Sequence, residues 1–253
     1  MYLEPMDGGI SKALVRHGFR EAGFMWMLRR EASGVAIDVG ANIGYCTLSL
    51  ADKCEKVYAY EPDPRSYKLL EMNTRKLLNV IISSKAVTQD GGTIHLTLAN
   101  KPNLSSICVS GDGINVESVS LKSHFPEVTF IKMDIEGAEI DVLSGCIKEL
   151  IAAKSMKLLM EVHPKLYGER RETFKDILKC LLNSGYSFKY VENAKEKMSE
   201  FNNAGYVPLK TFKNYPERSI FENVKSEHVI KWSAEMPEDG HKAIRSFMLC
   251  KGF

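Results

Sequence analysis

The feature that most constrains this chain is an alternation of short β-branched runs with segments of helical periodicity, beginning near Gly34. The apolar runs predict buried strands over 35–38, 57–60, 80–86, 130–133 and 158–162. The segments between them predict helices over 43–52, 64–78 and 136–150, and Pro64 suits a first helical turn. Nearly continuous apolar strands separated by helices indicate a parallel sheet covered on both faces. Right-handed crossovers then give a doubly wound α/β fold.

The 253 residues are enough for one such domain and short for two. Residues 1–33 carry an incomplete apolar stripe, which predicts a helical segment packed on the sheet. Residues 91–121 predict a β-rich insertion, because a Gly-Gly pair is followed by a run of period two (Thr93–Leu98) and then by a polar stretch. Residues 194–240 are polar and interrupted by prolines; they predict a lid over the substrate or a loosely packed connection, and we favour the lid. Residues 244–250 predict a final strand.

Composition excludes several classes of protein. The net charge of +2 and the pI near 8.1 are too weakly basic for a nucleic-acid-binding domain. The six cysteines form no Cys-x-x-Cys pair or zinc-like cluster, and most lie in apolar runs, which predicts buried free thiols in a reducing compartment. No signal-peptide core is present, and no run approaches the ~20 apolar residues of a membrane span. We therefore expect a soluble cytoplasmic protein without a nucleic-acid partner.

A glycine-rich turn, Asp38-Val-Gly40-Ala-Asn42-Ile-Gly44, stands where the first strand gives way to a helix. Ligands of open parallel sheets bind outside the carboxyl ends of the strands, at such turns. Gly40 and Gly44 allow the backbone to turn sharply and to approach a ligand closely. Asn42 stands where the dinucleotide fingerprint Gly-x-Gly-x-x-Gly needs its second glycine. A nicotinamide dehydrogenase is therefore disfavoured.

Two carboxylates narrow the choice of cofactor. Asp38 would repel a pyrophosphate but could accept hydrogen bonds, directly or through water, from the cationic methionine end of S-adenosylmethionine. Glu61 follows the second strand, and a carboxylate there can take both ribose hydroxyls. Adenine contacts are expected in the loop after the third strand, near Ala86 and Val87. Each residue alone also has a structural interpretation as a cap, turn or surface residue; in this order they indicate S-adenosylmethionine.

The reacting end of the site is expected where the fourth and fifth strands end. Asp134 and Glu136 follow the fourth strand, and Glu161 and His163 end the fifth. Methyl transfer is an in-line displacement that depends on alignment, and a hydroxyl nucleophile gains from a base. His163, with an unperturbed pKa of ~6.5, is the leading candidate for that base, and Asp134 is the alternative. Glu139 lies inside the expected helix, where a structural role is favoured.

These four strand-end residues could also hold a divalent cation, but nothing in their spacing demands one, so we predict no metal. For Glu136, a role in the site and a stabilising charge at a helix N-terminus are equally supported interpretations.

Together these motifs resemble the FkbM-type methyltransferases. The likeness covers residues 34–165 and rests on Asp38–Gly44, Tyr60-Glu61-Pro62, Ala86-Val87, Ile131–Glu139 and Met160–His163. It implies a class I, S-adenosylmethionine-dependent enzyme that mostly O-methylates hydroxyls of sugars, glycolipids or polyketide-like products. It also implies a seven-stranded sheet of order 3-2-1-4-5-7-6 with the last strand antiparallel. Gly18-Phe-Arg20-Glu21 resembles an upstream element of some members.

Other functions stay open at this point. The runner-up is an RNA or protein methyltransferase, although Met133–Gly137 stands where base N-methylases carry an Asn-Pro-Pro-Tyr-like tetrapeptide. A non-catalytic cofactor-binding subunit is a further alternative, but it would not need Asp134, Glu161 and His163 beside an intact turn. A small-molecule acceptor is favoured. We expect it to be specified by the C-terminal segment, which matches no motif, and by the polar stretch at 103–106.

Overall fold

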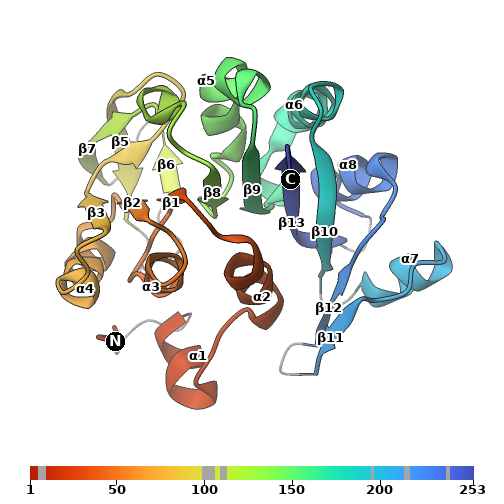
Figure 1. Ribbon diagram of the computed structural model, residues 1–253, viewed down its shortest axis with the longest axis horizontal. Helices are drawn as coiled ribbons and strands as arrows, with labels where there is room; N and C mark the ends of the chain where they lie inside the picture. The colour runs from red at the N-terminus through yellow and green to blue at the C-terminus, as the bar shows by residue number, and fades with distance from the viewer. Residues whose placement is uncertain (5–9, 99–105, 109–112, 195–196, 214–216, 238–239) are drawn as a thin grey trace.

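The computed structural model describes residues 1–4, 10–98, 106–108, 113–194, 197–213, 217–237 and 240–253. Its centre is a nine-stranded sheet of order β11-β12-β10-β13-β9-β8-β1-β2-β3, with helices on both faces (Figure 1). Among the described residues, no helix has the length and apolar character needed to cross a bilayer. The expected doubly wound α/β fold is confirmed.

The middle of the sheet follows the predicted pattern. The five predicted strands are parallel and occupy β1 (Val35–Val39), β2 (Lys56–Tyr60), β3 (Val80–Ser83), β8 (Phe130–Met133) and β9 (Met156–Glu161). The final strand, β13 (Ile244–Lys251), runs antiparallel between β9 and β10 (Ser187–Asn193). This arrangement reproduces the order 3-2-1-4-5-7-6. β10 and the helix before it, α6 (Arg171–Asn183), had not been predicted individually.

The helices begin and end where backbone geometry dictates. The helices that precede β10 in the described part of the chain are α1 (Ile10–His17), α2 (Ala22–Glu31), α3 (Tyr45–Ala51), α4 (Pro64–Thr74) and α5 (Glu139–Ala152), together with α6. α3 begins after Gly44, which has a φ of 90°, and α5 begins three residues later than predicted because Glu136 and Gly137 both have positive φ. The strand predicted over 80–86 stops at Ser83.

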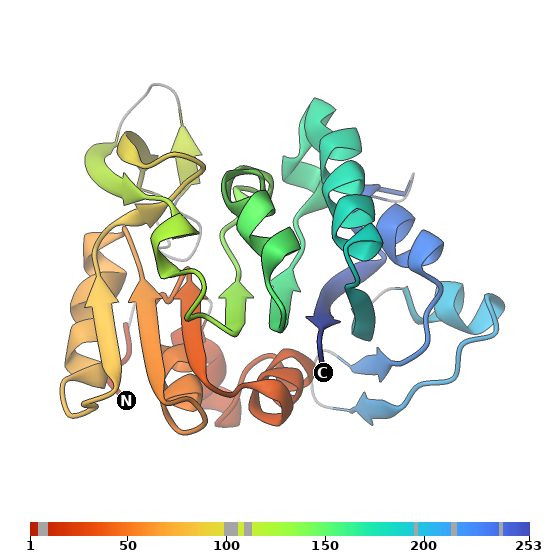
Figure 2. The ribbon, with the colours of Figure 1, turned by 45° about the horizontal axis from the view of Figure 1, so that its top comes forward.

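Residues 86–119 build a separate four-stranded sheet of order β4-β7-β5-β6, which confirms the β-rich insertion. Its strands are β4 (Ala86–Val87), β5 (Gly92–Thr97), β6 (Ser106–Cys108) and β7 (Ile114–Val119). The small sheet lies beyond the arrowheads of β1, β2 and β3 in Figure 2, over the end of the main sheet where a ligand is expected. Asn103 and Ser105, from the polar stretch expected to contact the acceptor, lie outside the described residues.

The segment 194–240 contains more regular structure than predicted. Its elements are α7 (Met198–Asn203), β11 (Lys210–Phe212), β12 (Arg218–Phe221) and α8 (Ser226–Ala234). β12 pairs with β10 and β11 with β12, so the sheet gains two strands beyond the seven implied by the family resemblance. Phe201 stacks on Phe221 with ring centroids 4.4 Å apart, which argues against a loosely packed connection. A lid function for this segment stays a prediction.

The apolar cores on the two faces of the sheet position the strand ends. Ile37, Ile131 and Leu158 pack on one face, and Ala36, Phe130 and Leu159 on the other. The free thiols of Cys46, Cys54, Cys146 and Cys250 are buried, as expected. Cys180 is exposed, against that expectation.

Candidate functional site

A cavity opens at the carboxyl ends of β1, β2 and β8, where the sequence predicts the cofactor. The turns after these strands supply one wall, and the small sheet supplies Ala86, Val87 and Leu96. The turn between α1 and α2 supplies Arg20 and Glu21 from the N-terminal segment. Elements from three separate parts of the chain therefore enclose one space.

The glycine-rich turn is shaped by its backbone. Gly40 has a φ of 76°, and a Cβ there would collide with the carbonyl oxygen of Asp134. The amides of Gly40 and Ala41 both donate to the carbonyl of Tyr60, at 3.1 and 2.9 Å. Gly40, Ala41 and Asn42 line the cavity, whereas Gly44 starts α3 and does not. Only glycine fits at position 40, because both the φ and the close approach exclude a side chain.

Glu61 lines the same cavity and is buried, with 7% of its surface exposed. Its Oε2 accepts from the amide of Asn42 at 2.8 Å, and its Oε1 from the amide of Asp63 at 2.9 Å. Burial raises the pKa of Glu61 to about 7, against the lowering effect of these two hydrogen bonds. Each carboxylate oxygen has a second lone pair, so the group can still accept from a ligand.

Asp38 is placed differently from our expectation. It is fully buried and does not line the cavity. Its Oδ1 lies 2.9 Å from Nζ of Lys132, and its Oδ2 accepts from the hydroxyl of Thr47 at 2.7 Å. Lys132 Nζ also donates to the carbonyl of Gly40 at 2.6 Å. Asp38 therefore holds the turn through Lys132, and it is Lys132 that reaches the cavity.

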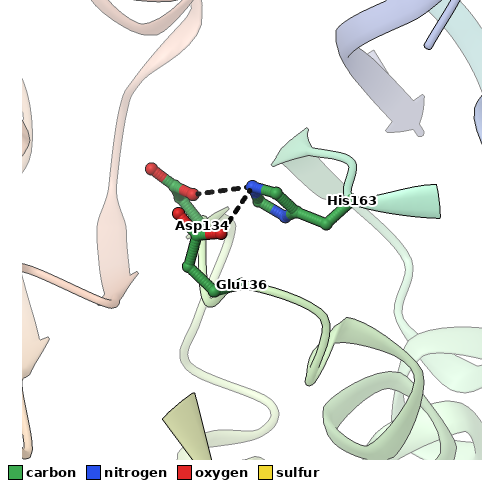
Figure 3. Close-up of side chains that lie close together, drawn as sticks. All are labelled: Asp134, Glu136 and His163. Atoms are coloured by element: carbon green, nitrogen blue, oxygen red, sulfur yellow. Dashed lines mark ion pairs between the residues drawn. The ribbon is translucent and has the colours of Figure 1, made fainter. Parts of the chain in front are cut away.

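The three strand-end carboxylates, Asp134, Glu136 and Glu161, come together around the imidazole of His163. Its Nε2 lies 3.7 Å from Oδ1 of Asp134 and 3.6 Å from Oε2 of Glu136 (Figure 3). The same nitrogen lies 3.7 Å from Oε1 of Glu161. On the other side of the ring, Nδ1 makes a 2.6 Å hydrogen bond with Oε1 of Glu139, which is fully buried. The predicted convergence of strand ends therefore matches the structure, with Glu139 as an additional partner.

This environment changes the expected proton chemistry. Burial alone would lower the pKa of His163, but the hydrogen bond to Glu139 and the surrounding carboxylates raise it to about 9. The ring therefore carries both protons at neutral pH and cannot accept another, which argues against His163 as the base. Burial and the nearby Glu161 raise the pKa of Asp134 to about 7. Asp134 lines the first cavity, and a carboxyl with this pKa is partly ionised at neutral pH.

Glu161 is committed to basic partners. Burial would raise its pKa, but Arg245 and Lys242 lower it to about 2. Arg245 lies 2.7 Å from Oε2 of Glu161, and Lys242 lies 3.2 Å from Oε1. Glu161 lines neither this cavity nor the one described next. Its contacts are those of a residue that positions its neighbours.

A second cavity adjoins the first. Glu136 lines both, and His163 lines the second. The other walls come from residues after β9, from both ends and the β12 strand of the segment 194–240, and from the start of β13. They comprise Pro164, Lys165, Leu166, Ala194, Arg218, Met236, Gly240, His241, Lys242 and Arg245. The carboxylate and imidazole cluster thus lies where two separate spaces meet.

Comparison with known proteins identifies the family. The model of the methyltransferase FkbM domain matches residues 38–188. The chain belongs to the FkbM methyltransferase family. The hexuronic acid methyltransferase AglP of Haloferax volcanii is 26% identical over 145 residues, which are 53% of this chain and 57% of AglP. The chain therefore spans little more than half the length of this relative.

Solved structures that the chain is similar to include an FkbM methyltransferase from Methylobacillus flagellatus KT. It is 20% identical, with a TM-score of 0.43 covering 63% of this chain and 39% of that one. A precorrin-6y C5,15-methyltransferase from Geobacter metallireducens GS-15 is 11% identical, with a TM-score of 0.45 covering 99% and 93% of the two chains.

Several charged residues of this FkbM site were missed from the sequence. Nη2 of Arg245 donates to Oε1 of Glu21 at 2.6 Å, although the two residues are 224 positions apart in the chain. A local sequence pattern cannot predict such a pair. Lys132 lies inside the motif Ile131–Glu139 that carries the family resemblance, but no role was predicted for its side chain. The resemblance of Gly18–Glu21 to an upstream family element was the one available signal for Arg20 and Glu21, which do line the cofactor cavity.

The cluster also has the composition of a cation site. Ligand atoms of Asp134, Glu136 and His163 lie within 4.8 Å of one another, as do those of Glu21, Asp134 and Glu161. In this structure, the positive charges of His163, Lys242 and Arg245 already face these carboxylates. The expectation that no metal is needed stays a prediction.

Proposed function

We propose that this FkbM chain is an S-adenosylmethionine-dependent O-methyltransferase that acts on a hydroxyl of a sugar, lipid or other small molecule. The observation that carries the proposal is the meeting of two cavities at Glu136. One is lined by the glycine-rich turn and Glu61, and the other by His163. Two-substrate transfer requires a cofactor space and an acceptor space that share the reacting centre.

The residues of the first cavity suit S-adenosylmethionine. Ala86, Val87 and Leu96 offer an apolar surface for adenine, and Glu61 can accept hydrogen bonds from the ribose hydroxyls. Asp134 supplies a carboxylate for the cationic methionine end. When bound, the cofactor supplies an electrophilic methyl group attached to a positively charged sulfur.

Asp134 is assigned the role of general base. With a pKa of about 7, this carboxyl is partly ionised at neutral pH and can accept the proton of an acceptor hydroxyl at its Oδ atoms as the hydroxyl oxygen attacks. His163, positively charged and 3.7 Å away, keeps the ionised form of Asp134 favourable and does not itself accept the proton. Glu136 lines both cavities and orients the acceptor between them.

Glu139 and Glu161 act through other residues. The 2.6 Å contact from Glu139 fixes the orientation of the His163 ring. Glu161 holds Arg245 and Lys242 at the end of β9 and so ties the final strand to the site. Both are positioning residues in this account.

A carbohydrate acceptor is supported by the relative named as a hexuronic acid methyltransferase, at 26% identity over 145 residues. The near balance of charge, +2 overall, disfavours RNA as an acceptor.

The test is a screen with a radiolabelled methyl donor against carbohydrates, lipids and small hydroxyl compounds, with RNA and protein as comparison acceptors. The proposal predicts label in an alkali-stable ether of a small molecule. Label found only in RNA or protein, or only in alkali-labile esters, would contradict it.

A further inference from the structure

The second cavity has an unusual surplus of positive charge. Its basic side chains are Lys165, Arg218, Lys242 and Arg245, and its carboxylate is Glu136. The adjoining imidazole of His163 adds a further positive charge at neutral pH, because its pKa is raised to about 9 by Glu139 and the nearby carboxylates, which outweigh burial. A space of this charge attracts anions.

Two of these basic groups are neutralised within the protein. Arg245 bridges Glu21 and Glu161, at 2.6 and 2.7 Å. Lys242 contacts Glu161 at 3.2 Å and donates to the carbonyl of Val162 at 2.7 Å. Neither depends on a ligand for its partner.

Arg218 is in a different situation. It forms no ion pair with any residue in the described part of the chain, and its Nε is buried without a hydrogen-bond partner. Burial and the neighbouring Arg245 lower the pKa of Arg218, and they outweigh the raising effect of the carboxylates Glu192, Glu161 and Glu21, none of which forms an ion pair with it in the described part of the chain. A half-buried guanidinium with an unpartnered Nε and no ion-pair partner is unfavourable, and a bound carboxylate or phosphate would relieve that cost.

Glu192 is the internal alternative as a partner for Arg218. Its carboxyl is fully buried, and its Oε2 accepts from the hydroxyl of Ser246 at 2.6 Å. Burial raises the pKa of Glu192, which weakens it as a counterion, and no ion pair forms between it and Arg218 among the described residues. Arg218 thus remains available to a ligand.

Lys165 adds a second available charge. It follows Pro164 directly after His163, and its side chain is exposed. Like Arg218, it makes no ion pair within the described ranges. Arg218 comes from β12, one of the two strands beyond the seven implied by the family resemblance, so the extra strands bring a binding group to the acceptor side.

We propose that the acceptor is an acidic molecule, and that Arg218, assisted by Lys165, binds its carboxylate or phosphate in the second cavity. This inference rests on the proposed transfer function and specifies its substrate class. A guanidinium can hold either group through two parallel hydrogen bonds. A uronic acid and a sugar phosphate therefore both fit the proposal, and the titrations below distinguish them.

Calorimetric titration of the protein with glucuronate, glucose 1-phosphate and glucose, with and without S-adenosylhomocysteine, tests the proposal. We expect at least one acidic sugar to bind ten or more times tighter than glucose, and the tighter of the two identifies the group. Arg218→Gln should weaken binding of that acidic sugar at least tenfold and leave the affinity for glucose unchanged. Arg218→Lys, which keeps the charge, should lose less.

Arg16→Gln, an exposed arginine on α1, is the matched control and should bind as the native protein does. Affinity for S-adenosylhomocysteine should stay within twofold in all variants, which shows that they are folded. Equal binding of the acidic sugars by Arg218→Gln and the native protein, or no preference over glucose, would overturn the proposal. Absence of S-adenosylhomocysteine binding by the native protein would instead contradict the proposed function. The two failures are distinguishable because the sugars are also titrated without S-adenosylhomocysteine.

Discussion

The two cavities that meet at Glu136 are built in different ways. The first cavity is built around the turn after β1, whose path is set by Gly40 and by hydrogen bonds to the carbonyl of Tyr60. The second cavity is formed by side chains from distant parts of the chain, such as Lys165 and Arg218.

The two cavities also differ in whether their basic side chains have ion-pair partners within the protein. In the first, Lys132 is neutralised inside the protein by Asp38 at 2.9 Å. In the second, Arg218 makes no ion pair within the residues that the structure describes. Under the proposed function, the second cavity is therefore the one whose charge would select among acceptors.

The largest effect should come from the point where the cavities meet. Asp134→Asn should reduce the rate of methyl transfer by about 10²–10⁴-fold, because it removes the group that accepts the proton. Affinity for S-adenosylhomocysteine should fall much less, by about tenfold, because the substitution also removes the carboxylate proposed to face the methionine end. Steady-state kinetics and calorimetry check both. Asp141→Asn, an exposed carboxylate paired with Arg170, is the control and should leave the rate unchanged. An Asp134→Asn variant with native kcat would remove Asp134 from the reaction.

A backbone change should break the first cavity alone. Gly40→Ala places a Cβ against the carbonyl oxygen of Asp134 at a positive φ, and we expect a loss of about 3 kcal/mol in binding of S-adenosylhomocysteine or in stability. Calorimetry and thermal unfolding measure the two. Gly168→Ala has the same sign of φ with open space around its Cβ, and should show only the smaller backbone strain. Equal effects of the two substitutions would mean that the collision is unimportant.

The same contrast explains what could be predicted from sequence. The turn from Asp38 to Gly44 and the carboxylate Glu61 are local patterns next to buried strands, so their place at the sheet edge follows from chain order. Arg218 and Arg245 reach the site through strand pairings at the far side of the sheet, which periodicity does not reveal. The chemistry of His163 could not be predicted either, because its pKa depends on Glu139, whose approach is a matter of tertiary packing.

Glu61 should show a moderate effect with a characteristic dependence on pH. Glu61→Ala should weaken binding of S-adenosylhomocysteine at least tenfold, or about 1.4 kcal/mol. Because burial raises the pKa of Glu61 to about 7, native affinity should fall as the pH is lowered through that value and the carboxylate is protonated. The variant should lack this step. Calorimetric titrations from roughly pH 6 to 8 measure this change in affinity. The same change in the native protein and in the variant would assign it to a group other than Glu61.

A smaller effect is expected in stability. The pKa of His163 rises from 6.5 to about 9 on folding, chiefly through Glu139 working against burial. The stabilisation is therefore fully present below pH 6.5 and is lost as the pH rises through about 9. Thermal unfolding should show the difference between native protein and His163→Gln narrowing over that interval. A difference that widens with rising pH would show that the imidazole is neutral in the folded protein.

Chelation should have the smallest effect. Because His163, Lys242 and Arg245 already neutralise the strand-end carboxylates, we expect no change in transfer rate after treatment with EDTA. Loss of activity restored by a divalent cation would turn the cluster of Asp134, Glu136 and His163 into a metal site.

The central claim is that the turn at Gly40 and the carboxylate of Glu61 form a site for S-adenosylmethionine. Calorimetric titration of the native protein with S-adenosylhomocysteine, alongside Glu61→Ala, tests it most directly. The account predicts one site per chain, with affinity at least tenfold weaker in the variant. No heat of binding with the native protein, or the same affinity in both proteins, would contradict it.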